Sequence, residues 1–156
     1  MLHPVHRPRA IELLTPAAMG EADRRTIAAG RPGIALMETA GAAVAARVRD
    51  LWDGGAVVVL CGPGNNGGDG FVAARLLAAW GFDVRLHLRG EVRALKSDAA
   101  IAAERWGRAV QPFAEPVLDG AGIVVDALFG AGLTRALAAD VAAWADACGA
   151  AGVRVD

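Results

Sequence analysis

Residues 56–70, AVVVLCGPGNNGGDG, place an apolar run directly before a glycine-rich segment that carries two asparagines and one aspartate. Residues 56–60 contain no polar side chain, which is typical of a strand buried on both faces of a parallel sheet. From Asp69 onward, in FVAARLLAAW, the apolar residues recur at helical spacing. A strand, a loop with exposed backbone N–H groups and a helix N-terminus favour the binding of a polar or anionic ligand.

Composition limits the classes of protein to consider. A chain of 156 residues is expected to form one domain, and a net charge of −1 gives no electrostatic reason to bind nucleic acid. No apolar run approaches the roughly 18 residues of a membrane span. The cysteines Cys61 and Cys148 have no metal-site spacing and need no disulfide. We expect a soluble, cytoplasmic protein whose residues 1–12 are a disordered leader.

Along the chain, apolar runs alternate with helical patterns after two N-terminal helices. The expected helices cover residues 16–29, 34–51, 69–80, 97–106 and 136–148, and the expected strands cover 56–61, 82–88, 109–112, 122–128 and 152–156. We therefore predict a Rossmann-like, doubly wound, mostly parallel sheet between two helical layers, a three-layer α/β/α fold. Residues 82–88 alternate in polarity, so we expect one side of this strand, including His87, to face solvent.

Polar residues follow three of the expected strands. The first group is the glycine-rich segment, the second is Asp126 with the turn FGAGLTR at 129–135, and the third is Asp156. Because ligands of open α/β sheets bind outside the carboxyl ends of the strands, these groups are expected to lie at one edge. Asp156 stands at the end of an apparent strand, so we expect a domain over 13–156 that is incomplete at its C-terminus.

The glycine-rich segment leaves several ligands open. Residues 62–67 satisfy G-x-G-x-x-G, the fingerprint of nicotinamide-dinucleotide binding. However, the acid expected about 20 residues later is replaced by the run from His87 to Arg89, and Asp69 at the helix start would repel a phosphate. Asn65, Asn66 and Asp126 instead supply hard oxygens suited to a weakly held cation, or to ligand hydroxyl and amide groups.

Five segments carry a resemblance to a known family. The run GPGNNGGDGFVAARLL at 62–77 resembles the signature of the NAD(P)H-hydrate epimerase family, the YjeF N-terminal domain, and DALFGAGLTR at 126–135 is similar to its second motif. LLTPAAMGEAD and PGIALMETAG, at 13–23 and 32–41, resemble its N-terminal helical pair. VRVD at 153–156 is similar to the start of its Val-Asp-x-Pro-Ser-Gly segment, whose serine is a further potassium ligand in the family. We therefore expect a C-terminally truncated copy, or the N-terminal part of a bifunctional repair enzyme.

This resemblance implies an isomerase that interconverts the two C6 epimers of hydrated NADH or NADPH. It implies K⁺ held by Asn66 and Asp126, and Asp156 as the catalytic residue at the reacting nicotinamide end. Substrate binding is implied for Asn65, Asn66, Gly67, Gly68, Asp69, Gly130, Ala131, Gly132, Leu133, Thr134, Arg135, Ala136 and Asp156. The implied partners are an NAD(P)H-hydrate dehydratase, which is fused in some relatives, and a second copy of the chain in a homodimer. A non-catalytic dimerisation module and a redox Rossmann domain remain alternatives.

Overall fold

The computed structural model describes residues 14–114, 116–130, 133–134, 136–151 and 154–155. Two helices come first, α1 (Pro16–Ala28) and α2 (Gly33–Leu51), close to the predicted bounds. Thr15 caps α1, because its Oγ1 accepts a hydrogen bond from the backbone N of Ala18 at 3.2 Å. The predicted leader lies outside the described residues.

A five-stranded sheet follows, and each described strand pair is parallel. Its strands are β1 (Ala56–Cys61), β2 (Val84–Leu88), β3 (Gln111–Pro112), β4 (Ala121–Ala127) and β5 (Arg154–Val155), in the spatial order β3-β2-β1-β4-β5. The connecting elements are α3 (Asn65–Ala79), the short 3₁₀ helix η1 (Val92–Ala94), α4 (Ser97–Trp106) and α5 (Ala139–Ala151). This order confirms the doubly wound parallel sheet.

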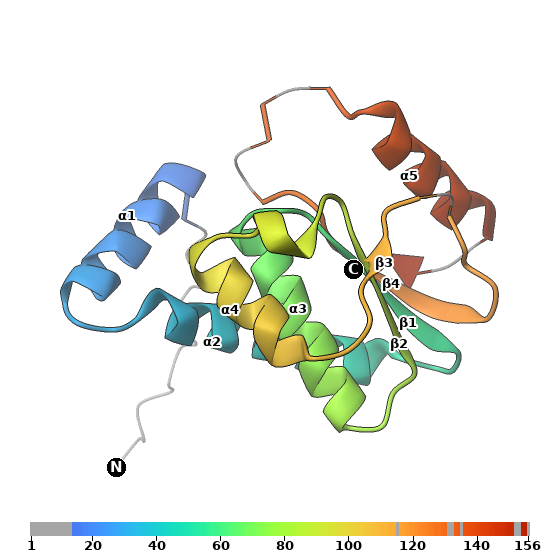
Figure 1. The fold of residues 1–156 in the computed structure, drawn as a ribbon, viewed down its shortest axis with the longest axis horizontal. Coiled ribbons are helices and arrows are strands. Elements are labelled where there is room, and N and C mark those ends of the chain that lie inside the picture. Colours follow the sequence, from blue (N-terminus) through green and yellow to red (C-terminus); the bar gives the residue numbers. More distant parts are fainter. Residues whose placement is uncertain (1–13, 115, 131–132, 135, 152–153, 156) are drawn as a thin grey trace, which may run out of the picture.

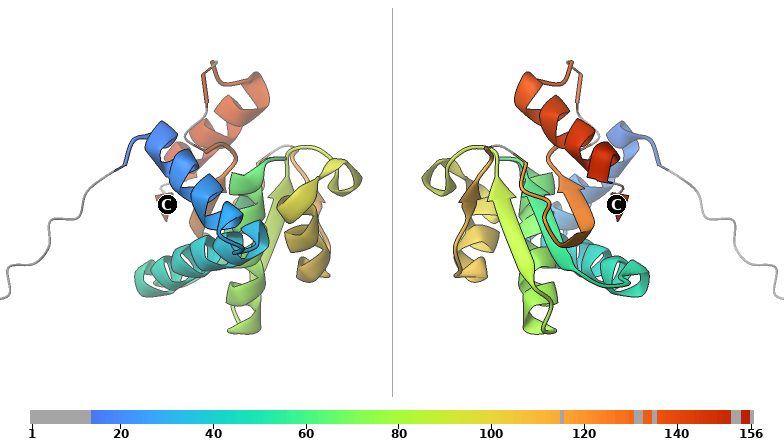
Figure 2. Two further views of the ribbon diagram at one scale, coloured as in Figure 1. Left: turned by 90° about the vertical axis from the view of Figure 1, so that its left-hand side faces the viewer. Right: turned by 90° about the vertical axis from the view of Figure 1, so that its right-hand side faces the viewer.

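Helices cover both faces of the sheet (Figures 1 and 2), which confirms the three predicted layers. The larger core lies between one face and helices α2, α3 and α4, with Val57 and Val59 of β1 among its buried members. The smaller core lies against α5 and includes Val58 and Leu60 of the same strand. All six residues of β1 are buried, as the uninterrupted apolar run predicts.

The prediction that one side of 82–88 faces solvent is wrong. The last three residues of β2 are buried, and His87 is only 3% exposed. Its ring packs edge-on against Trp144 of α5, with centroids 5.0 Å apart, and its Nδ1 lies 3.2 Å from the carbonyl oxygen of Pro112. A polar residue in an alternating strand thus belongs to the smaller core, because α5 closes over that face.

The glycine-rich segment also differs from its prediction. Helix α3 begins at Asn65 and not at Asp69, and the N–H of Gly68 already donates to the carbonyl oxygen of Gly64 at 3.1 Å. A Cβ on Gly67 would collide with the carbonyl oxygen of Gly62, so only glycine allows the helix to start this close to the end of β1. Tertiary packing therefore outweighs the low helix propensity of glycine, which costs about 1 kcal/mol per residue relative to alanine.

Candidate active site

The carboxyl ends of β1 and β4 meet at the centre of the sheet. The chain leaves β1 toward β2 on one side, whereas β4 lies on the other side, so this is the topological switch point. Cys61 and Ala127 end the two strands in register, and the backbone N of Gly62 donates to the carbonyl oxygen of Ala127 at 3.0 Å. The two motifs therefore lie side by side, at the position where open α/β sheets bind ligands.

A cavity of about 570 Å³, here called the loop cleft, opens between the two motifs. It brings together several predicted substrate-binding residues from both motifs and adds Arg89, which follows β2. Its described lining consists of Pro63, Gly64, Asn65, Asn66, Arg89, Leu128, Phe129, Gly130, Leu133 and Thr134. Gly67 and Gly68 are buried in α3 and do not line it, so their described contacts are packing contacts.

A second cavity, of about 380 Å³, lies between α2, the start of α3 and the end of β4, and is here called the α2 cavity. Asn66 and Asp126 both line it, which brings the two predicted potassium ligands to one space. The Oδ1 atom of Asp126 accepts a hydrogen bond from the backbone N of Leu128 at 3.0 Å, which orients the carboxylate at the strand end.

The donor chemistry of the α2 cavity suits a hard, weakly held cation. An amide oxygen from Asn66 and a carboxylate oxygen from Asp126 are hard ligands, and backbone carbonyls are the usual complement in such sites. Within the described ranges, no group of three or more His, Cys, Asp or Glu side chains is arranged to hold a metal ion.

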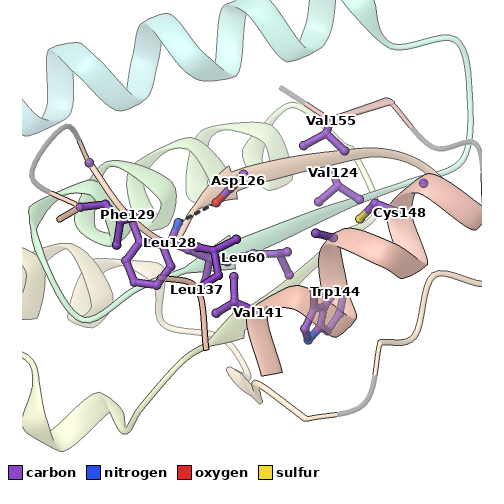
Figure 3. A pocket seen from close by; sticks show the side chains of 14 residues that line it. Leu60, Val124, Asp126, Leu128, Phe129, Leu137, Val141, Trp144, Cys148 and Val155 are labelled. Carbon is purple, nitrogen blue, oxygen red and sulfur yellow. Dashed lines mark hydrogen bonds between the residues drawn. The ribbon is translucent and has the colours of Figure 1, made fainter. Parts of the chain in front are cut away.

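A third cavity, of about 450 Å³, separates β4 from α5 and is here called the α5 pocket (Figure 3). Its walls are mainly apolar and include Leu60, Val124, Val141, Trp144 and Val155, with Asp126 among them. The pocket shares Leu128, Phe129, Gly130 and Leu133 with the loop cleft. An apolar space thus adjoins a polar one at the switch point, a combination suited to a ligand with a flat ring and polar groups.

The two cysteines near these cavities are poor nucleophiles. Burial raises the pKa of the Cys61 thiol far above its ordinary value. Burial also raises the pKa of Cys148 in the α5 pocket, and the negative charge of Asp126 adds to that effect. Because the reactive species is the thiolate, neither residue is prepared for covalent catalysis.

Asp69 is the unusual carboxyl group of the site. Burial, followed by the negative charge of Asp23 in α1, raises its pKa to about 6. It is the fifth residue of α3, so the prediction that it stands at the helix start is wrong. Asp69 lines the α2 cavity together with Asn66, and it also lines a cavity of about 300 Å³ together with Asp23. An acid that titrates near neutral pH is suited to proton transfer or to binding a ligand hydroxyl group.

Several predicted site residues lie outside the described residues. They are Ala131, Gly132, Arg135 and Asp156. Ala136 is exposed, and it is absent from the described linings of all three cavities. Sequence reasoning missed Arg89 as a lining residue, although its position at the end of the second strand is where dinucleotide-binding folds carry a ribose- or phosphate-recognising side chain.

Comparison with known proteins places this arrangement in a family. Residues 33–155 match the family model described as YjeF-related protein N-terminus. The chain belongs to this family.

Relatives with similar sequences carry informative names. The chain is 46% identical over 138 residues to the NAD(P)H-hydrate epimerase of Rhodobacter capsulatus, covering 81% of this chain and 65% of that protein. It is 43% identical over 150 residues to the NAD(P)H-hydrate epimerase of Achromobacter xylosoxidans, covering 89% and 67%. It is 39% identical over 135 residues to the bifunctional NAD(P)H-hydrate repair enzyme Nnr of Methanothermobacter thermautotrophicus, covering 78% and 26%.

The chain therefore spans about two thirds of the length of these epimerases and about a quarter of the bifunctional protein. The crystal structure of yeast ynu0 has the same fold, with a TM-score of 0.78 at 21% sequence identity, covering 93% of this chain and 68% of that one. No described helix is both long and apolar enough to cross a membrane.

Proposed function

We propose that this chain carries the epimerase activity for hydrated NADH and NADPH, within a protein that repairs these damaged cofactors. The observation that carries the proposal is the convergence of Asn66 and Asp126 on the α2 cavity, beside a cleft built from both motifs. A redox cofactor has no need of an amide and a carboxylate at this point. The names of the relatives support the same activity.

The two adjoining cavities suit different parts of such a ligand. We propose that the loop cleft takes the sugar–phosphate part, because its described lining offers asparagine amides, a threonine and a cation. The α5 pocket takes the hydrated nicotinamide ring, because its walls are apolar and it reaches Val155, the neighbour of Asp156. The proposed K⁺ would be held by Asn66 and Asp126, where it would supply positive charge that orders the loops around the ligand.

Inversion at C6 requires that one bond to this carbon breaks and forms again. C6 of the hydrate bears both a hydroxyl group and the ring nitrogen, so the nitrogen lone pair can expel the hydroxyl, or an electron pair of the hydroxyl oxygen can expel the nitrogen. In one route the C6–O bond breaks, Asp156 protonates the departing hydroxyl, and water returns to the other face. In the other route Asp156 takes the hydroxyl proton, the oxygen's electron pair forms the aldehyde carbonyl as the N1–C6 bond breaks, and Asp156 delivers the proton to N1. After rotation about the C5–C6 bond, the reverse steps close the ring on the other face. A carboxyl group near the hydroxyl can serve either route as general acid and base.

The activity is tested by giving the protein one purified epimer of NADH hydrate and following the other by chromatography, with and without K⁺. We expect exchange in the wild type, and Asp126→Ala should lose both K⁺ dependence and most of the exchange. Asp53→Ala, which removes the same charge from an exposed position, should exchange like the wild type. Epimer exchange that stays K⁺-dependent in Asp126→Ala would remove the cation assignment.

The role of Asp156 has its own test. Asp156→Asn should slow exchange by about 100-fold or more, the usual contribution of a general acid or base. Activity near that of the wild type would refute the assignment. Exchange in water enriched in ¹⁸O separates the routes, because loss of the C6–O bond must incorporate the label at the same rate as epimerisation.

The cofactor itself provides a further comparison. Calorimetric titration of NADH against its hydrate should show a preference for the hydrate. Equal affinity for both would contradict the repair function and favour redox use, whereas binding of neither would favour a dimerisation module. We also propose a homodimer, a cytoplasmic location and a functional partnership with an NAD(P)H-hydrate dehydratase, the last supported by the name of the bifunctional relative.

A further inference from the structure

Arg89 places a positive charge in the loop cleft. It follows β2 directly, and its backbone N donates to the carbonyl oxygen of Cys61 at 2.8 Å, which fixes it beside the turn into α3. Its side chain is 28% exposed and lines the cleft opposite the second motif. Among the described lining residues, Arg89 is the only one with a charge. An anionic ligand in this cleft therefore meets one described cation.

In the structure this cation is paired. Its Nε donates to Oδ2 of Asp140 at 2.7 Å and one terminal nitrogen donates to Oδ1 at 3.2 Å, a two-point contact between the end of β2 and the first turn of α5. Asp140 is 42% exposed, so water can replace the guanidinium. The pKa of Asp140 is lowered mainly by Arg89, and the backbone N–H groups of Val141 and Asp140 contribute as well. Its carboxylate thus keeps stabilising partners at the helix N-terminus if Arg89 departs.

We propose that Arg89 exchanges Asp140 for a phosphate group of the bound dinucleotide. Asp140 then holds the guanidinium of Arg89 only while the cleft is empty. This inference rests on the proposed function and names one further ligand-binding residue. The planar guanidinium presents two parallel N–H groups, and a phosphate accepts them in the same geometry as the carboxylate that it replaces. The phosphate belongs either to the diphosphate bridge or to the 2′-phosphate of the NADPH form.

Titrating the protein with NADH hydrate and with NADPH hydrate shows which of these two phosphate groups Arg89 binds. Arg89→Ala should weaken binding by about 10- to 100-fold, the usual loss for a hydrogen-bonded ion pair. If both hydrates lose affinity, the group is the diphosphate; if only NADPH hydrate does, it is the 2′-phosphate. Arg89→Lys should recover only part of the loss, since a lysine cannot make the two-point contact. Arg93→Ala removes the same charge from a nearby exposed side chain and should bind both hydrates like the wild type.

Asp140→Asn distinguishes exchange from a merely structural tie. Both Arg89→Ala and Asp140→Asn remove the ion pair and should lower the melting temperature by similar amounts. Only the exchange predicts opposite effects on affinity, with Asp140→Asn binding roughly two- to fivefold more tightly because a competitor of the phosphate is gone. The proposal would be overturned if both variants bound the hydrates equally weakly, or if Arg89→Ala bound them like the wild type. Epimer exchange by the wild type would still support the proposed function in either case. Wild-type protein that neither binds nor exchanges the hydrates would overturn both.

Discussion

Asp69 provides a prediction whose sign and size follow from its surroundings. Its folded-state pKa is raised to about 6 from an ordinary value of 3.8, first by burial and then by Asp23. The folded protein therefore holds this proton more tightly than the unfolded chain does. The stability linked to Asp69 is complete below about pH 4 and is lost as the pH rises through about 6.

The size can be worked from the same observation. At about 1.4 kcal/mol per tenfold change in proton affinity, the raised pKa corresponds to about 3 kcal/mol. Because the side chain is only partly buried, solvent screening reduces this to about 1–1.5 kcal/mol. Asn has nearly the shape of a protonated Asp and carries no charge. Asp69→Asn should therefore raise the free energy of unfolding by about 1–1.5 kcal/mol at pH 8 and leave it nearly unchanged at pH 4.

The assay is urea unfolding followed by tryptophan fluorescence at several pH values, for the wild type, Asp69→Asn and Asp53→Asn. The exposed control should differ from the wild type by less than about 0.5 kcal/mol at every pH. A gain for Asp69→Asn that is equally large at pH 4 and pH 8 would refute the electrostatic reasoning. So would the absence of any gain at pH 8.

Two further perturbations test the packing. Burial, the largest effect, lowers the pKa of His87 below its ordinary value of 6.5, so the folded state resists its protonation and the linked stability is lost as the pH falls below about 6.5. Urea unfolding of His87→Phe should show the variant gaining on the wild type as the pH falls from 7 to 5, and parallel curves would contradict this assignment. Gly67→Ala should lower the free energy of unfolding by about 1–3 kcal/mol, because its Cβ collides with the carbonyl oxygen of Gly62. Ala46→Gly, a change in the middle of α2, costs about 1 kcal/mol by propensity alone and serves as its reference.

The alternation of apolar runs and helical patterns was sufficient to predict the layers of the fold. β1 was predicted at its observed bounds, because its apolar run has the length of a strand and ends where the glycine-rich segment begins. His87 was wrongly predicted to face solvent. Alternating polarity distinguishes the two faces of a strand, but it does not show whether a later helix covers the polar face. Helix α5, which covers this face, lies more than 50 residues later in the chain, so the residues around His87 do not predict its contact with Trp144.

The site was predictable in its location and less so in its detail. Asn66 and Asp126 were expected at one edge, because carboxyl ends of parallel strands meet there, and the α2 cavity brings them together. The start of α3 was placed four residues late, since glycines normally argue against a helix and only their contacts with Gly62 and Met37 explain them. The raised pKa of Asp69 depends on burial and on Asp23 in another helix, so it could not be foreseen from neighbouring residues.

The close approach of α3 to the end of β1 affects how the family can diverge. Gly67 and Gly70 are required by backbone and side-chain neighbours inside the protein, and therefore persist under selection for folding alone. In the described part of the chain, Asn66 and Asp126 are not held by such a steric constraint, although the Asp126 carboxylate accepts one hydrogen bond from the backbone N of Leu128. A family member that has lost catalysis can thus retain the glycines for as long as it folds, while the residues at positions 66 and 126 change. The proposed function therefore predicts that, across the family, loss of activity accompanies changes at Asn66 and Asp126 more closely than changes at Gly67 and Gly70.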